Sequence, residues 1–304
     1  MARSSRRLAV VGASGQLGSD LVRCGRESGY EVVSLTHDDV EVTDARSIEA
    51  ALEAATAEVV IDCAAFHQVD ECERDPATAF AVNSIGAASI ARAARRRGAR
   101  TVFVSTDYVF SGTKPFSGPT GPASPVDAYT EDEPTGPVNA YGVSKLAGEM
   151  LVRQADDGAL IVRTAGLFGR TGSRGKKGTN FVEQVLRQVR IGAPLRVVDD
   201  QYVTPTYTLD AAQAIIALID LGATGIVHVA AAGACTWHEF ASRCVAQVEA
   251  RLEVERIGAA ERSAGAARPA NTALCVDRLA SLLRRPVRPW TEALAAYLSE
   301  MGHV

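Results

Sequence analysis

The chain lacks the features of a membrane or secreted protein. No apolar run approaches the roughly 20 residues that a membrane-spanning helix requires, although 47% of its 304 residues are hydrophobic. The basic start MARSSRR is followed by an apolar run that stops at Gly12, which is not typical of a secretory signal. The six cysteines form no Cys-x-x-Cys pair, so they read as reduced packing residues, and we assign no metal site. We expect a globular, cytoplasmic protein without a membrane partner.

The chain also lacks a strong excess of charge of either sign. Its formal net charge is −4 and its isoelectric point is about 5.8. Nucleic-acid-binding domains usually have a pronounced basic surface, so we expect no nucleic-acid partner. The sequence has no internal repeat, and its length suits one large α/β domain or two lobes.

Segments typical of strands and of helices alternate over the first two-thirds of the chain. Asp75-Pro76 is a typical helix start, because Asp suits the N-cap and Pro suits the first turn. Alternation on this scale predicts an α/β fold with a doubly wound parallel sheet, in which ligands bind at the carboxyl ends of the strands. The predicted strands are residues 8–12, 30–35, 58–61, 101–104 and 158–163, and the predicted helices between them are residues 16–28, 44–56, 76–97 and 141–156.

A glycine-rich turn, GASGQLG, follows the first predicted strand, with glycines at Gly12, Gly15 and Gly18. Glycines permit a tight turn and a close backbone approach to a pyrophosphate, and the free N–H groups at a helix start attract the anion. Such a turn alone could be an ordinary β-to-α connection. Its position after the first strand favours a dinucleotide site.

A second motif places a phenol beside a cation. Tyr141 and Lys145 lie four residues apart at the start of a predicted helix, so they share one face. A phenol is a poor acid or base near neutral pH unless a nearby cation stabilises its anion, and Lys145 can supply that charge. Thr106 follows the apolar run VFVS, which overlaps the predicted strand 101–104, and can hold a substrate oxygen against the phenol. These residues predict proton transfer to or from a carbonyl or alcohol oxygen.

The motifs suggest how the chain is divided. We expect a dinucleotide-binding domain over residues 1–165, with residues 195–230 returning to it. Residues 166–304 are expected to form mainly a smaller, mostly C-terminal substrate-binding lobe. Residues 112–139 are rich in Gly and Pro without periodicity, and a loop of this length between two catalytic positions is typical of a lid.

With these motifs in view, the chain resembles an extended short-chain dehydrogenase/reductase with a Rossmann fold, and more narrowly the dTDP-4-dehydrorhamnose reductase family. The resemblance implies NAD(P)H-dependent reduction of the 4-keto group of a nucleotide-activated, dTDP-linked 4-keto-6-deoxysugar, with the proton from Tyr141. A homodimer is left open. The order of the matching strings over the whole chain makes the resemblance specific: GASGQLG (12–18), IDCAAF (61–66), VDECERDPATAFAVN (69–83), STDYVFSG (105–112), YTEDEPTGPVNAYGVSKLAGE (129–149), RTAGLFG (163–169), NFV (180–182), VVDDQYVTPTY (197–207), GIVHVAAAG (225–233) and RPANTAL (268–274).

The resemblance also implies roles for individual positions. Asp70 has an alternative role as a helix-capping carboxylate. Arg268 has an alternative structural role, although its planar fork suits a diphosphate. The implied catalytic residues are Thr106, Tyr141 and Lys145; the implied cofactor-binding residues are Gly12, Ser14, Gly15, Gln16, Leu17, Asp62, Ala64, Ala65 and Lys145; the implied substrate-binding residues are Asp70, Asp107, Tyr108, Asn180 and Arg268.

The sequence specifies the choice of cofactor and the identity of the sugar less precisely than it specifies the catalytic residues. The second predicted strand ends in Thr36-His37, where an NAD-preferring site usually has an acid on the ribose 2′-hydroxyl. We therefore expect NADPH to be preferred and NADH to be usable. Gly166 stands where related reductases often have a large aromatic residue, so the sugar can differ from theirs. Two other functions stay open: a nucleotide-sugar epimerase of the same superfamily, and a non-catalytic regulatory subunit resembling that of methionine adenosyltransferase.

Overall fold

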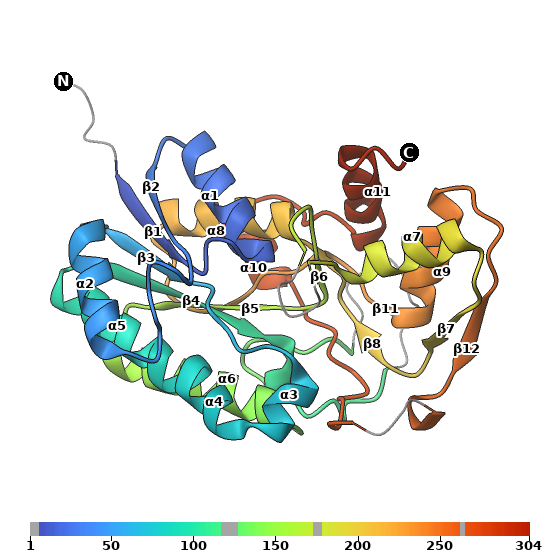
Figure 1. Ribbon diagram of the computed structural model, residues 1–304, viewed down its shortest axis with the longest axis horizontal. Helices are drawn as coiled ribbons and strands as arrows, with labels where there is room; N and C mark the ends of the chain where they lie inside the picture. The colour runs from blue at the N-terminus through green and yellow to red at the C-terminus, as the bar shows by residue number, and fades with distance from the viewer. Residues whose placement is uncertain (1–5, 117–126, 173–177, 262–264) are drawn as a thin grey trace.

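The computed structural model describes residues 6–116, 127–172, 178–261 and 265–304 (Figure 1). Its centre is a six-stranded sheet with the order β10-β5-β4-β3-β1-β2, and all neighbouring strands are parallel. The chain runs outward from β1 to β2 and returns on the other side of β1 with β3, which creates the crevice expected of a doubly wound sheet. The predicted fold class is confirmed. The strands are β1 (Arg7–Val11), β2 (Glu31–Leu35), β3 (Val59–Asp62), β4 (Arg100–Thr106), β5 (Leu160–Thr164) and β10 (Gly225–His228).

Both faces of this sheet are covered by helices, and side chains alternate between the faces along each strand. In β1, Leu8 and Val10 belong to the core on one face of the sheet, whereas Ala9 and Val11 belong to the core on the opposite face. Burial of both faces explains why the strands are almost continuously apolar. One face is covered by α1 (Gln16–Glu27), α8 (Thr208–Asp220) and α10 (Asp277–Leu283), and the other by α2 (Ala45–Ala55), α5 (Ala87–Arg96) and α6 (Ala140–Ala155).

The single helix predicted over residues 76–97 is divided into three parts. The start is as predicted, because the Asp75 carboxylate accepts the N-cap hydrogen bond of the first part. A π-helical turn then interrupts the α-helix and turns the buried Asn83 towards the loop after β3. There its amide exchanges two hydrogen bonds of 2.9 Å with the backbone of Phe66. The parts are α4 (Pro76–Phe80), the π-helical segment η1 (Ala81–Gly86) and α5, and a short helix α3 (Val69–Arg74) precedes them.

The second half of the chain builds a smaller lobe beside the sheet, with its own core (Figure 1). Aromatic side chains dominate this core: Phe168 stacks on Tyr207 and meets Tyr297 edge to face, with ring centroids 5.7 and 5.4 Å apart. The lobe contains three small sheets, β6 with β9, β7 with β12 and β8 with β11. Its elements are β6 (Leu167–Phe168), α7 (Phe181–Ile191), β7 (Leu195–Val198), β8 (Tyr202–Val203), β9 (Thr206–Tyr207), β11 (Cys235–Thr236), α9 (Trp237–Gln247), β12 (Val254–Ile257) and α11 (Trp290–Glu300).

Residues 195–230 are shared between the two parts of the molecule. Helix α8 packs against α1, and β10 pairs with β5 and extends the large sheet. In contrast, β7 pairs with β12 and β8 with β11, both outside the large sheet. The exact domain boundaries stay a prediction.

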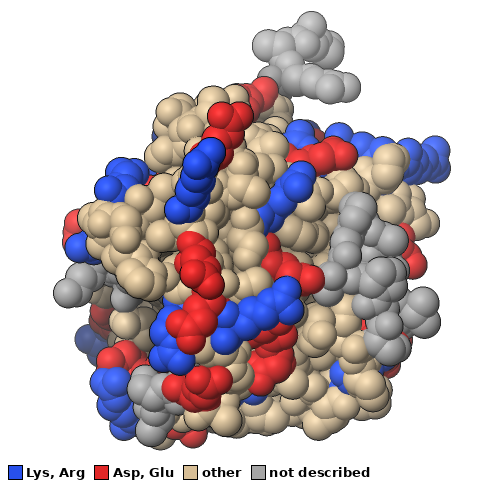
Figure 2. Space-filling view, turned by 90° about the vertical axis from the view of Figure 1, so that its right-hand side faces the viewer, with Lys and Arg blue, Asp and Glu red and all other residues tan. Residues whose placement is uncertain are grey.

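The surface beside β7 and β12 has charges of both signs. Figure 2 shows basic and acidic side chains interleaved on this face. Arg196, for example, pairs with both Glu255 and Glu261. Among the described helices, none is long and apolar enough to span a bilayer.

Both described ends of the predicted lid are attached to one segment of the C-terminal lobe. Residues 117–126 lie outside the described part of the chain. On either side of them, the Asn271 amide donates to the carbonyls of Lys114 and Asp127, at 3.2 and 3.1 Å. Tyr129 then forms backbone hydrogen bonds with Ala273 and Cys275. The lid role itself stays a prediction.

Candidate active site

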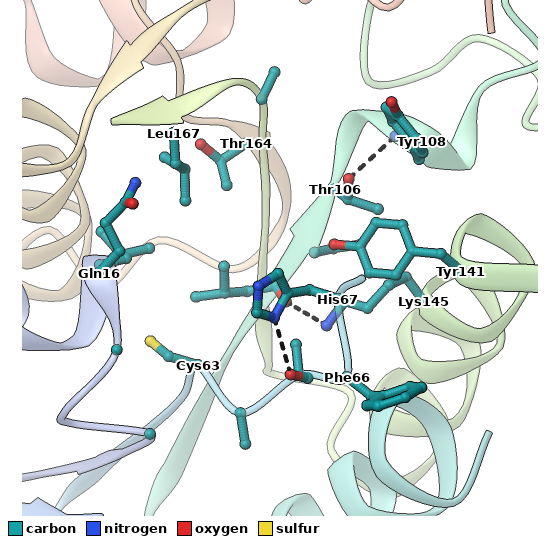
Figure 3. A pocket seen from close by; sticks show the side chains of 18 of the residues that line it. Gln16, Cys63, Phe66, His67, Thr106, Tyr108, Tyr141, Lys145, Thr164 and Leu167 are labelled. Carbon is teal, nitrogen blue, oxygen red and sulfur yellow. Dashed lines mark hydrogen bonds between the residues drawn. The ribbon is translucent and has the colours of Figure 1, made fainter. Parts of the chain in front are cut away.

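A cavity of about 660 Å³ opens at the carboxyl ends of β1, β3, β4 and β5 (Figure 3). One end is formed by the glycine turn and the other by residues of the C-terminal lobe. Of the sequence-predicted residues, Asp62, Asp70 and Arg268 are not in its lining. Those that line it are Gly12, Ser14, Gly15, Gln16, Leu17, Ala64, Ala65, Thr106, Asp107, Tyr108, Tyr141, Lys145 and Asn180.

The glycine turn leaves the start of α1 open to the cavity. Gly12 has φ +78°, and a Cβ there would lie 3.1 Å from the backbone of Cys63 and Ala64. A Cβ on Gly18 would lie only 2.2 Å from the carbonyl oxygen of Gly12. Both glycines are therefore required by the close approach of β1, α1 and the loop after β3. Because Gly15 occupies the N-cap, no side chain blocks the free N–H groups of the first turn.

Three candidate catalytic side chains converge between the two ends of the cavity. Tyr141 and Lys145 project from the first turns of α6, which begins after the N-cap Asn139. The phenol of Tyr141 lies beside the side chain of Thr106 at the end of β4. Figure 3 shows Tyr141 and Lys145 side by side, with Thr106 facing the phenol. The structure thus brings together the three residues that the sequence predicts to act together.

Burial changes the acidity of two of these groups in opposite senses. Lys145 is 1% exposed and donates a 2.7 Å hydrogen bond to the carbonyl of Val104. Loss of hydration lowers the pKa of Lys145 to about 8, because the charged form is disfavoured away from water. Burial raises the pKa of Tyr141 for the same reason, while the neighbouring hydroxyl of Thr106 opposes the rise. At neutral pH, Lys145 is therefore mainly charged and the phenol retains its proton.

A buried ion pair anchors α6 against the sheet one turn beyond Lys145. Arg163 on β5 donates two hydrogen bonds of 2.9 and 2.8 Å to the carboxylate of Glu149. Ser105, next to Thr106, donates a 2.5 Å hydrogen bond to the same carboxylate. Glu149 and Arg163 are each 2% exposed. Together these contacts set the distance between the helix and the end of β4.

Asp107 and Tyr108 follow Thr106 in a short 3-10 turn, η2 (Asp107–Val109). The hydroxyl of Thr106 donates to Asp107 at 2.9 Å and accepts from the Tyr108 amide at 3.2 Å. Burial raises the pKa of the Asp107 carboxyl to about 6. The ring of Tyr108 meets that of Tyr141 edge to face, with centroids 5.9 Å apart. Both residues thus border the candidate catalytic group.

Asp70 and Arg268 form a bidentate ion pair behind the cavity lining. Both N–O distances are 2.8 Å, and Asp70 also accepts the amide of Ala266 at 2.9 Å. The pair joins α3 to the segment that precedes Pro269. Pro269 itself lines the cavity. In this structure the guanidinium fork of Arg268 holds a carboxylate, so a substrate diphosphate would have to compete with Asp70 for it.

Asn180 lines the cavity, but its amide is used within the protein. Its Oδ1 accepts the N-cap hydrogen bond of α7 from Glu183 at 3.0 Å. Its Nδ2 donates to the carbonyl of Gly169 and to the hydroxyl of Tyr297, at 2.8 and 3.1 Å. The structure therefore shows a structural role for this side chain, and substrate contact stays a prediction.

The sequence analysis missed an aromatic wall in the C-terminal lobe. Phe181 and Trp237 line the cavity and meet edge to face, with ring centroids 4.8 Å apart. Tyr202 lines the same end. Phe181 and Trp237 are the first residues of α7 and α9, so each starts a helix at the cavity edge. No local pattern links them, because they lie more than fifty residues apart in the chain.

Comparisons with known proteins agree with this site. The family described as RmlD substrate binding domain matches residues 6–303. This chain belongs to that family. The match confirms the resemblance to the dTDP-4-dehydrorhamnose reductases.

Individual relatives in this family cover almost the whole chain. A spore coat polysaccharide biosynthesis protein, SpsK, of Bacillus subtilis (strain 168) is 37% identical, over 97% of each chain. A dTDP-4-keto-6-deoxy-D-glucose reductase of Streptomyces niveus is 38% identical, over 95% of each chain. A crystal structure of dTDP-4-dehydrorhamnose reductase from Bacillus anthracis, in complex with NADP, has a TM-score of 0.88 and 30% identity, covering 97% of this chain and 99% of that one.

Proposed function

We propose that this chain is an NADPH-dependent 4-ketoreductase of a dTDP-linked 4-keto-6-deoxysugar. The observation that supports this most is the position of Tyr141, between the glycine turn at one end of the cavity and the aromatic wall at the other. A cofactor on the glycine turn and a sugar nucleotide against the aromatic wall would meet beside its phenol. The relatives in Streptomyces niveus and Bacillus anthracis are reductases of such sugars, and the latter was crystallised with NADP.

The residues at the glycine end suit a dinucleotide. A Cβ at Gly12 or Gly18 would obstruct the turn, and the open N-terminus of α1 favours a pyrophosphate. After β2, Asp39 is turned back to accept hydrogen bonds from the amide and hydroxyl of Thr36, at 2.8 and 2.6 Å. This acid is therefore occupied within its own turn, which agrees with a preference for NADPH over NADH. When bound, the nicotinamide supplies the hydride that reaches C4 of the sugar.

The protein residues then handle the oxygen and its proton. The Thr106 hydroxyl turns its proton from Asp107 to the substrate carbonyl oxygen and holds that oxygen against the phenol of Tyr141. Tyr141 donates its proton to that oxygen as negative charge develops on it. Lys145, charged below pH about 8, stabilises the phenolate that remains. The bond from Lys145 to the Val104 carbonyl keeps the ammonium group in place.

The decisive assay follows the loss of NADPH absorbance with a panel of nucleotide-linked 4-keto-6-deoxysugars. Stoichiometric cofactor oxidation with one or more of them is expected, with NADPH preferred over NADH. An epimerase would convert its sugar without net oxidation of NADPH, and a regulatory subunit would turn over none of the panel. Either result would contradict the proposal.

We further propose a cytoplasmic location, which suits six free thiols, and a homodimer, which light scattering can test.

A further inference from the structure

Asp62 lies on the same face of the sheet as Lys145, although it is not part of the cavity lining. It ends β3 and is paired in register with Phe103 of β4, so the two side chains point to the same side. The ammonium group of Lys145 lies 3.9 Å above the Phe103 ring. Asp62 is 2% exposed, and its carboxylate accepts one hydrogen bond of 3.0 Å, from the amide of Ala64.

Two buried carboxylates thus flank Lys145, but only one is free of a cationic partner. Glu149 is held by both arms of Arg163 and is electrically compensated. Among the described residues, Asp62 forms no ion pair at contact distance. Its charge therefore acts on Lys145 through the buried interior on this face of the sheet, where little water screens it.

We propose that Asp62 is a positioning residue that keeps Lys145 charged beside Tyr141. The proposal rests on the proposed reductase function for its catalytic part. Asp62 touches neither reacting atom and acts through the ammonium group alone. This role differs from the contact with the adenosine side of the cofactor that the sequence implies for Asp62.

The direction of the effect follows from the groups that face Lys145. These are Asp62 from β3, Glu149 and Tyr141 from α6, and the thiol of Cys63, whose pKa burial raises so that it stays neutral. The negative charges of Asp62 and Glu149 raise the pKa of Lys145, while burial lowers it to about 8. The pKa of Asp62 is raised to about 6 by burial. Both groups are therefore charged between pH about 6 and 8, the range in which the pair can act.

Asp62→Asn removes this charge and keeps an acceptor for the Ala64 amide. The pKa of Lys145 should then fall by about one pH unit, the lower part of the range for loss of a nearby opposite charge. Its direct measurement needs no substrate. The chain has only four lysines, at 114, 145, 176 and 177, so the ¹³C signals of labelled lysine are few, and Lys145→Met identifies the relevant one.

A matched control removes another buried carboxylate, at the far end of the helix that carries Lys145. Asp156, 3% exposed, caps the C-terminal end of α6, about three turns from Lys145. In Asp156→Asn the NMR titration midpoint of Lys145 should stay at its wild-type value. An Asp62→Asn protein with the wild-type midpoint would overturn the proposal. If Asp62→Asn does not fold, Asp62→Ser serves as the second variant with the same expected shift.

The activity measurement tests the catalytic part. In Asp62→Asn, the alkaline limb of the pH profile of kcat should move to lower pH by the same amount as the NMR titration midpoint of Lys145. The KM for the sugar nucleotide should change little. A limb that stays in place while the midpoint moves would also overturn the proposal. If the wild-type protein reduces no sugar nucleotide, the proposed function fails, while the NMR titration still decides whether Asp62 keeps Lys145 charged.

Discussion

Tyr141→Phe is the sharpest test of the candidate catalytic centre, because it removes one oxygen atom and almost no volume. The ring should keep its edge-to-face contact with Tyr108, whose centroid lies 5.9 Å away. The variant loses the polar contact between the phenol and the neighbouring hydroxyl of Thr106. Even a full hydrogen bond contributes only about 1 kcal/mol to stability, so the protein should remain folded and should still bind NADPH.

The expected loss of activity is much larger than this structural cost. General acid catalysis by a positioned group is worth roughly 10²- to 10⁴-fold in kcat, or about 3 to 5 kcal/mol in the barrier. Because burial raises the pKa of Tyr141, its proton is present throughout the neutral range. The loss should therefore be seen at every pH below about 8, where Lys145 is charged.

Single-turnover measurements with NADPH and the preferred sugar nucleotide give the chemical step directly, without product release. NADPH fluorescence and the melting temperature show whether binding and folding are intact. Tyr30→Phe is a matched control: it removes the buried hydroxyl that donates to Asp220 at 2.6 Å, at the opposite end of the strands from the cavity. Its turnover should equal that of the wild type. A Tyr141→Phe protein with near-normal single-turnover rate would show that the proton comes from another group.

Three further predictions concern residues around this centre. Thr106→Val should lower kcat less than loss of the phenol, by below about 10²-fold, because the residue orients the oxygen and does not supply the main proton; an equal loss in single-turnover assays would contradict this. Arg268→Lys should raise KM for the sugar nucleotide and leave the Kd of NADPH unchanged, since a lysine cannot reproduce the bidentate fork that now holds Asp70; an equal change in both constants would refute a substrate role. Glu149→Gln should lower the free energy of unfolding by about 3 to 5 kcal/mol, because the buried guanidinium of Arg163 loses its charged partner; denaturant unfolding measures this, and a loss below 1 kcal/mol would contradict it.

Much of the large sheet could be predicted from local sequence. Strands buried on both faces must be apolar nearly throughout, so β1, β3 and β5 are visible as short apolar runs. The helix start at Asp75 and the catalytic spacing of Tyr141 and Lys145 are also local, because a cap and an i, i+4 pair are defined within a few residues. The glycine turn needs no side chains from elsewhere to be recognised, and the structure shows the close backbone approach that Gly12 and Gly18 permit.

Other features depend on residues that are distant in the chain. The π-helical turn at Asn83 has no periodic signal, since it is stabilised by hydrogen bonds to Phe66 and not by the pattern of its own segment. The pairing of Asp70 with Arg268 joins positions almost two hundred residues apart. The residues next to Asp70 and Arg268 in the sequence do not indicate that these two side chains form an ion pair.

The electrostatics of the cavity were decided in the same way. Sequence alone places Tyr141 beside a lysine, which is enough to predict proton transfer. How strongly Lys145 holds its proton depends on its burial between α6 and the sheet and on the charge of Asp62, which the register of β3 and β4 places on the same face. A pKa responds to every charge and every water molecule within a few ångströms. The environment of Lys145 therefore exists only once the strands are paired.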